Sequence, residues 1–491
     1  MGVPEMTRRS LVRAGAGALA GVALRPAATL ASQGGQGRIA TIVLGSLRGA
    51  RTVALPAGVA VAGLQWRGGS AAPAAEMRAR LAGDTWGPWV PAGGHGHGPD
   101  SAVGGPQTGE PLWVGGAREI ELRSAGPLEG GRLRLVLEPT APAAALAASL
   151  PLAQPVLAAG AGQPPIIARQ AWAKGIPLPR VAPEYGAVEL AFVHHTENPN
   201  GYTAAQVPAM LRAIFLFHRE VNGWNDIGYN FVIDRFGRVW EARAGGIDEP
   251  VAGAQAGGYN FVSSGVAVLG SFMSTQISRA AHEALQRLLA WKLSLHGTPS
   301  TGRVTVRVNP AGAGYSKYPA NARVSLRRVS GHRDADSTDC PGNALYGQLP
   351  AIRRQVTRLS GTPVAATLTL VPAAPPPAAR AEGAPAPPVA PEQPPELLVT
   401  LARLDGTPLP ALPVALQART VARKGLVVTH TLLAEGVTDA TGRCVFAASF
   451  AVGAARPVWV RAQCPGGSGA PAAVSPVVEV KPVAAAQTPA A

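Results

Sequence analysis

Histidine and cysteine residues near the middle of the 491-residue chain have the types and spacing of a metal site. A short apolar segment that ends at Val193 leads directly into His194 and His195. Further along, His332 and Cys340 lie eight residues apart, and the Asp, Ser and Thr residues between them favour a turn that brings both side chains to one point. Two imidazoles and a thiolate suit Zn²⁺, which prefers nitrogen and sulfur ligands in a tetrahedral arrangement.

The number of protein ligands indicates what such a site would do. Three protein ligands leave a fourth position for water, as in catalytic zinc sites, and zinc lowers the pKa of that water to about 7. Tyr229 stands at the start of a hydrophobic strand, where its phenol could hydrogen-bond a tetrahedral intermediate. Taken alone, each residue also has a structural interpretation: His194 as a core histidine, and Tyr229 as strand packing. Together they predict a zinc site that activates water against a carbonyl.

The cysteine count supports the metal interpretation. Three cysteines are an odd number for an exported protein. Cys444 and Cys464 could bridge a loop of about 20 residues, worth roughly 3 kcal/mol in the chain-entropy model. Cys340 is then left alone, and the histidines around it favour a metal over a reactive or bridging thiol.

The N-terminus predicts export. Arg8 and Arg9 precede a weakly apolar stretch over 14–24, and a possible cleavage site follows at 28–31. We therefore expect a twin-arginine signal peptide over 1–31, with a disordered basic tail as the alternative. The stretch is too short to span a bilayer of about 30 Å. The expected mature chain is a monomer without a transmembrane anchor, extracellular or associated with the cell wall.

The charge of the chain restricts its partners. A formal net charge of +15 attracts polyanions without specificity. No Lys/Arg block is present and aromatic residues make up only 5%, which disfavours nucleic acid as a partner. Anionic wall polymers or a membrane surface fit the charge better.

The segments that must position these residues form an α/β region between two β-rich regions. Residues 164–358 combine short apolar runs, typical of buried strands, with helical stripes over 204–218 and 277–295. Residues 36–139 and 395–482 alternate apolar and polar residues, which predicts sheets with one buried face. We expect the second of these to be an immunoglobulin-like β domain. Ala/Pro-rich linkers are expected over 140–163 and 361–394, and a disordered tail over 483–491.

Two features of the first β-rich region could bear on function. Four tryptophans form either a core or partial core, the interpretation we favour, or a flat sugar-binding face: Trp66, Trp86, Trp89 and Trp113. His95 and His97 lie in a glycine-rich loop, and a solvated loop is favoured over a metal site because two ligands without partners are weak evidence.

Blocks of residues in the middle region resemble the peptidoglycan recognition protein and N-acetylmuramoyl-L-alanine amidase family, in its zinc-dependent branch and its actinobacterial exported type. The matching blocks are 166–172, 193–196, 217–218, 223–231, 237–243, 264–272, 331–334 and 340–346. The resemblance implies a central mixed sheet flanked by helices, with zinc in a groove. It also implies hydrolysis of the amide between the lactyl group of N-acetylmuramic acid and L-alanine of the stem peptide in peptidoglycan.

The resemblance assigns roles to individual residues. It makes His194, His332 and Cys340 the zinc ligands, Tyr229 a catalytic residue and Thr338 a second catalytic candidate. Around the zinc or along the substrate groove it places His195, His218, Trp224 and Arg333.

The chain also departs from the family pattern. Residues 299–325 form a longer insertion than the family implies, and Asn225 stands where animal members often carry Cys. Family members that only bind the wall typically lack the cysteine ligand, and this chain keeps Cys340. The alternative function is a non-catalytic peptidoglycan-binding protein, which the retained Cys340 disfavours.

Overall fold

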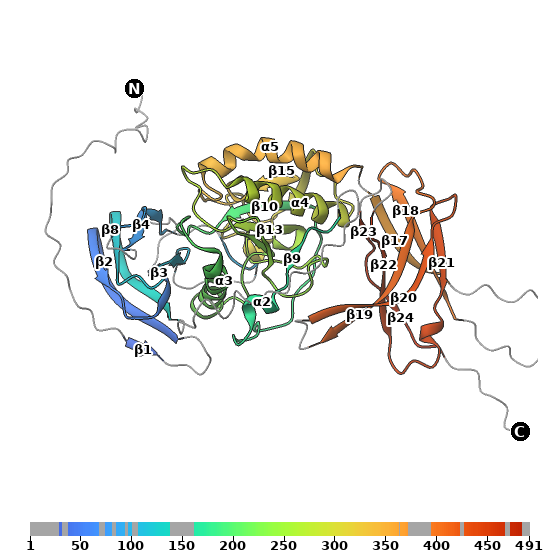
Figure 1. Cartoon of the computed structure of the whole chain (residues 1–491), viewed down its shortest axis with the longest axis horizontal. Helices are drawn as coiled ribbons and strands as arrows, with labels where there is room; N and C mark the ends of the chain where they lie inside the picture. The colour runs from blue at the N-terminus through green and yellow to red at the C-terminus, as the bar shows by residue number, and fades with distance from the viewer. Residues whose placement is uncertain are drawn as a thin grey trace, which may run out of the picture.

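A computed structural model describes residues 29–31, 38–67, 74–80, 85–93, 97–100, 107–137, 162–362, 364–371, 394–422, 427–466 and 472–483. They form three units in a row, with the helical unit in the middle (Figure 1). The predicted signal peptide up to residue 28, the predicted linker over 140–161 and the predicted tail from 484 lie outside the described residues. Residues Thr29–Ala31 of the predicted signal form a short strand, β1, which pairs with β2.

The N-terminal unit is a sheet with eight strands among the described residues, in the order β1-β2-β8-β3-β6. Strand β4 pairs with β8 and β5, and β7 pairs with β3; every pairing is antiparallel. The other strands are β2 (Arg38–Ala54), β3 (Val59–Trp66), β4 (Ala75–Ala79), β5 (Val90–Pro91), β6 (Gln107–Thr108), β7 (Leu112–Trp113) and β8 (Glu119–Leu137). The predicted period-two pattern is present in β8, where Ile120 and Leu122 are buried and Arg123 is exposed.

The burial of the four tryptophans fits core or partial-core anchors, and a sugar-binding face stays a prediction. Trp66 is buried, as expected for a core anchor, whereas Trp86, Trp89 and Trp113 are half-buried. The guanidinium carbon of Arg78 lies 4.9 Å from the ring centre of Trp86 and 4.4 Å from that of Trp89, so these rings pack against a cation at the sheet surface.

The middle unit contains a six-stranded mixed sheet among the described residues, in the order β16-β10-β13-β11-β12-β9. Its strands are β9 (Ile166–Ile167), β10 (Leu190–His195), β11 (Phe231–Ile233), β12 (Val239–Glu241), β13 (Ser263–Val268) and β16 (Val329–Gly331). Only β11 and β12 pair antiparallel; β16, β10, β13 and β11 run parallel. Parallel strands are buried on both faces, which explains their near-continuous apolar sequences.

Helices cover both faces of this sheet. Phe231 and Ile233 share one core cluster with α4 (Arg279–Leu295) and α5 (Asn343–Ser360), whereas Val232 between them shares another with α3 (Val207–Leu216). Short helix α2 (Gln170–Ala173) adds to the α3 side. This alternation follows from the side-chain period of a strand and confirms the α/β prediction for the middle region. In the described part of the chain, the helices are all too short or too polar to cross a membrane.

The predicted insertion over 299–325 is a hairpin. Strands β14 (Arg303–Arg307) and β15 (Arg323–Arg327) pair antiparallel. Val308 and Val324 of this hairpin pack in a cluster with Phe192 of β10 and Tyr259.

The N-terminal sheet packs directly on the middle unit. Val61 of β3 and Val136 of β8 belong to the same buried cluster as Phe215 and Phe217. The approach at Gly63 is so close that a Cβ atom there would lie 2.1 Å from the Phe217 ring, so the contact requires glycine. The backbone N–H of Trp113 also donates to Asn198 Oδ1 at 2.7 Å.

The C-terminal unit consists of two antiparallel sheets among the described residues, β17-β18-β21 and β20-β19-β22-β23, with β24 pairing with β22. Their bounds are β17 (Val364–Val371), β18 (Glu396–Arg403), β19 (Pro413–Ala422), β20 (Val427–Val437), β21 (Arg443–Ala447), β22 (Val458–Cys464), β23 (Ala473–Val474) and β24 (Val478–Val480). One buried cluster holds the sheets together. That the unit is immunoglobulin-like stays a prediction.

One expectation about this region is wrong, and one open possibility is not realised in the structure. Residues 364–371, inside the predicted linker, form β17, because Val364, Ala366 and Leu368 alternate into the core. Cys444 and Cys464 are both free thiols, and they lie on strands of different sheets.

Ion pairs join the C-terminal unit to the middle unit. Arg461 Nη2 lies 2.5 Å from Asp248 Oδ2, and Glu249 Oε1 lies 3.1 Å from Arg419 Nε and 2.9 Å from His430 Nε2. Although Asp248, Glu249 and His430 are grouped closely enough to hold a cation, the two arginines already neutralise the carboxylates.

Candidate metal centre and active site

The predicted ligands converge because neighbouring strands end side by side. His194 lies near the end of β10, and His332 directly follows β16, which runs parallel to β10 with Val193 opposite Gly331. Cys340 lies in the turn before α5, and its Sγ lies 3.6 Å from His194 Nδ1. All three side chains are buried.

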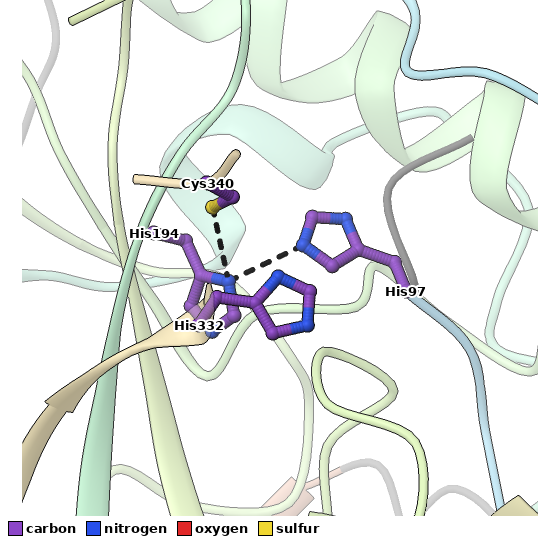
Figure 2. A group of neighbouring side chains, drawn as sticks. All are labelled: His97, His194, His332 and Cys340. Atoms are coloured by element: carbon purple, nitrogen blue, oxygen red, sulfur yellow. Dashed lines mark hydrogen bonds between the residues drawn. The ribbon is translucent and has the colours of Figure 1, made fainter. Parts of the chain in front are cut away.

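A fourth donor comes from the N-terminal unit. His97 projects into the cluster from a segment outside the middle domain, as Figure 2 shows. Its Nε2 lies 3.2 Å from His194 Nδ1, and its ring stacks on that of His332 with centroids 4.5 Å apart. The ligand atoms of His97, His194, His332 and Cys340 all lie within 4.8 Å of one another. The expectation of a solvated loop is therefore wrong for His97, and His95 lies outside the described residues.

The donor set fits zinc. Nitrogens about 2.0–2.1 Å from zinc and a sulfur about 2.3 Å away, at tetrahedral angles, lie roughly 3.3–3.6 Å from one another. The separations of His194 Nδ1 from His97 Nε2 (3.2 Å) and from Cys340 Sγ (3.6 Å) match those values. Imidazole and thiolate are the donor types that zinc selects.

Hydrogen bonds to the outer ring nitrogens fix which nitrogen faces the cluster. Oε1 of Gln255 lies 2.5 Å from His194 Nε2, and Asp336 Oδ2 lies 2.8 Å from His332 Nε2. Glu110 contacts His97 Nδ1. Histidine ligands of metals are commonly held this way by a carboxylate or carbonyl, which sets the tautomer and the ring orientation. These contacts leave Nδ1 of His194, Nδ1 of His332 and Nε2 of His97 facing the centre of the cluster.

Burial controls the charges in the cluster. It lowers the pKa of His194 well below its usual value, an effect that the nearby His97 reinforces, so the imidazole is neutral and able to ligate. Burial also raises the pKa of the Cys340 thiol well above its usual value. A divalent cation is the group that would favour the thiolate here, because coordination deprotonates a thiol.

Tyr229 lies beside the cluster, as predicted. Its ring centroid is 5.5 Å from those of both His194 and His97, and its hydroxyl is 3.5 Å from Glu110 Oε2. Burial raises its pKa well above 10, so the phenol keeps its proton and remains a hydrogen-bond donor.

The side chain of Thr338 contacts the backbone of Cys340. Its Oγ1 accepts a hydrogen bond from the Cys340 backbone N–H at 3.0 Å, which shapes the turn that presents the cysteine. This contact gives Thr338 a positioning role; its predicted catalytic role stays a prediction.

The four residues expected around the zinc or along the groove take different places. His195 is buried, its Nε2 lies 2.7 Å from Glu197 Oε1, and its backbone N–H donates to Cys340 Sγ at 3.4 Å. His218 accepts from the Gly228 N–H at 3.1 Å and packs on Trp224, so both buried rings support the segment before Tyr229. The remaining residue, Arg333, donates to Asn343 Oδ1 at 2.7 Å in an exposed hydrogen bond.

Comparison with known proteins identifies the middle domain. Residues 184–343 match the family model described as N-acetylmuramoyl-L-alanine amidase. Peptidoglycan-recognition protein SC2 of Drosophila simulans is 30% identical over 159 residues, which cover 32% of this chain and 71% of that protein. The chain belongs to the peptidoglycan-recognition protein and N-acetylmuramoyl-L-alanine amidase family.

Two further similarities were found. The N-acetylmuramoyl-L-alanine amidase of Sus scrofa is 29% identical over 194 residues, covering 38% of this chain and 27% of that protein. The solved structure of wild-type Drosophila PGRP-LB is 24% identical and covers 38% of this chain and 92% of that one, with a TM-score of 0.29.

Sequence reasoning missed several residues of this amidase-family site. His97 and Glu110 come from the preceding unit, and Gln255 and Asp336 lack a motif that marks them as partners of the ligands. Asp336 offered one signal, since a carboxylate four residues after a histidine ligand can reach its ring.

Proposed function

We propose that the chain is a zinc-dependent N-acetylmuramoyl-L-alanine amidase that hydrolyses the lactyl–L-alanine amide bond of bacterial peptidoglycan. The observation that carries this proposal is the convergence of His194, His332 and Cys340 beside Tyr229, in a domain of this family. Bound zinc would supply a Lewis acid and a water of lowered pKa. The names of the relatives, peptidoglycan-recognition proteins and an amidase, support this substrate class.

The chain's own residues would do the remaining work. The protonated phenol of Tyr229 would donate to the carbonyl oxygen as negative charge develops on it. Gln255 and Asp336 would keep the two ligating imidazoles in place. Burial excludes competing water and strengthens these interactions.

The proposal extends to where the enzyme acts. The twin-arginine pattern at Arg8 and Arg9 supports export, and a net charge of +15 supports attraction to anionic wall polymers. In this scheme the mature chain is a monomer at the cell wall, and residues 164–358 carry catalysis between the two β units.

Digestion of purified peptidoglycan tests the proposed reaction. Mass spectrometry should detect free stem peptides and lactyl groups, and a chelator should abolish their release. The Cys340→Ala variant should lose bound zinc, expected at about one ion per chain, together with hydrolysis. Unchanged hydrolysis by this variant would refute the proposal.

The alternative is a wall-binding protein without catalysis. It predicts that the chain sediments with peptidoglycan but releases no stem peptide at any zinc concentration. The retained cysteine ligand favours the enzyme, because a binding surface has no need of a buried thiol beside two histidines.

A further inference from the structure

The fourth donor of the cluster has a consequence for how the enzyme is controlled. We propose that His97 is a protein ligand of the metal and that the N-terminal unit thereby holds the chain in a latent state, which opens only when the 97–100 segment is displaced. The latency half of this inference, that the chain is held inactive, rests on the proposed function. The coordination half, that His97 is a metal ligand, rests on the geometry of His97 alone.

His97 is built as a ligand rather than placed near the cluster by accident. It is 8% exposed although it comes from a glycine-rich loop. Glu110 of the same unit contacts its Nδ1 and so directs Nε2 toward His194 Nδ1, 3.2 Å away. The same arrangement holds the other two histidines, through Gln255 and Asp336.

The position of His97 conflicts with substrate binding. Its ring lies beside both the ligand ring of His332 and the ring of Tyr229, with centroids 4.5 Å and 5.5 Å away, and its Nε2 takes the fourth donor position. A carbonyl oxygen that receives a hydrogen bond from the Tyr229 hydroxyl while lying at the metal needs this space. Three protein ligands with an open position are typical of catalytic zinc, whereas four are typical of structural zinc.

The segment after His97 is anchored to the middle unit by buried polar contacts. Asp100 is 6% exposed, and its Oδ1 accepts from the Gly258 N–H and from Asn260 Nδ2, both at 2.8 Å. Oδ2 of the same carboxylate accepts from Asn309 Nδ2 at 3.2 Å. Asn260 Nδ2 also lies 2.9 Å from the carbonyl oxygen of Gly98. A buried carboxylate with these donors holds the 97–100 segment in one position on the middle unit.

The hairpin insertion provides part of the receptor for this segment. Tyr315, between β14 and β15, packs so closely on Gly98 that a Cβ atom there would lie 2.4 Å from the ring. Asn309 belongs to the same insertion. The insertion therefore contacts both residues that flank Pro99, Gly98 through Tyr315 and Asp100 through Asn309.

Two variants open the site by different routes. His97→Ala removes the donor, and Gly98→Ala keeps the donor but forces the segment away from the Tyr315 ring. The matched controls are His282→Ala, a histidine on α4, and Gly314→Ala, where an added Cβ meets nothing within 4 Å. Retention of the wild-type circular dichroism spectrum by each variant shows that the fold is intact.

The coordination half is tested without activity, on full-length chains in which Co²⁺ replaces the native metal. Added azide should leave the visible d–d bands of the wild type and both controls unchanged, because no exchangeable position remains. In His97→Ala and Gly98→Ala, azide should shift these bands. An equal azide response in the wild type, or a His97→Ala spectrum identical to the wild-type spectrum, would overturn the ligand assignment.

The latency half is tested on the zinc-loaded chains with a soluble muramyl peptide. If the open state is populated to a tenth or less, both variants should hydrolyse at least about tenfold faster than the wild type. Slower hydrolysis by His97→Ala would overturn latency and make His97 a contributor to the reaction. If no chain hydrolyses but the azide responses are as expected, the proposed function fails and the ligand assignment stands.

Discussion

The Nε2 atom of His194 lies 2.5 Å from Oε1 of Gln255, and the amide of that glutamine is in turn held by Ser263, whose Oγ lies 2.9 Å from Nε2 of Gln255. The amide oxygen can only accept, so His194 carries its proton on Nε2 and presents Nδ1 to the centre of the cluster. A residue without any recognisable motif therefore decides which nitrogen of His194 would bind a metal.

Replacing Gln255 by Ala should weaken zinc binding by about 10–100-fold, because the ligand ring loses the partner that orients it. Competition with a chromogenic chelator measures this change. Gln286→Ala is the matched control, since Gln286 is also buried and bonded to a histidine, His282, away from the site. Equal zinc affinity in the two variants would show that the Gln255 contact has no orienting role.

Tyr229→Phe should lower kcat by about 10²–10³-fold, as expected when one donor to a developing oxyanion is removed. Zinc content should stay at the wild-type level, because the tyrosine hydroxyl lies outside the donor set. Parallel measurement of kcat and metal content separates a lost donor from a damaged site. A variant with normal kcat would exclude the phenol from the reaction.

Gly63→Ala should destabilise the chain by about 1–3 kcal/mol, because the new methyl group would overlap the buried Phe217 ring. Urea unfolding measures the loss. The matched control is Gly126→Ala, in the same sheet, where an added Cβ meets nothing within 4 Å. If both variants unfold at the same urea concentration, the contact between β3 and Phe217 does not hold the units together.

Lys292 predicts a pH dependence of stability. Its ammonium group is buried and donates to the carbonyl oxygens of Ile247 and Glu249 at 2.8 and 2.9 Å, and burial lowers its pKa to about 7. The unfolded chain restores the ordinary value of 10.5 and so binds more protons between these two pH values. The free energy of unfolding should therefore rise with pH from about 7 to 10, by at most about 1.4 kcal/mol per pH unit.

Comparison with Lys292→Met isolates this contribution, since methionine has a similar length and does not titrate. The stability difference between wild type and variant should change in favour of the wild type as the pH rises from 7 to 9. Thermal unfolding at several pH values measures this difference. A constant difference over that range would contradict the lowered pKa.

The sequence predicted the part of the site that depends on local pattern. Strand ends and turns have short-range sequence signatures. The sequence therefore predicted the strand that runs into His194 and the turn between His332 and Cys340. The middle α/β unit was predictable for the same reason. The convergence of His194 and His332 follows from parallel pairing of β10 and β16, which the sequence pattern did not predict.

The remainder depends on contacts between distant segments. His97 and His194 are 97 residues apart, and no periodicity links a histidine in a glycine-rich loop to a site in another unit. Likewise β17 was mistaken for linker, because its short alternation borders a long Ala/Pro-rich stretch and its partner β18 begins only at Glu396. Pairing across such separations is a tertiary property that composition does not report.

The position of His97 also bears on the cohesion of the molecule. An ion bound to residues on both sides of a 97-residue separation would act as a removable cross-link, comparable to a disulfide that closes a loop of about 100 residues, worth roughly 4.7 kcal/mol in the chain-entropy model. Metal depletion would then weaken the attachment of the N-terminal unit to the middle unit, in addition to removing the proposed activity. Its first sign should be faster amide hydrogen exchange in the N-terminal strands, while the helices α4 and α5 stay protected.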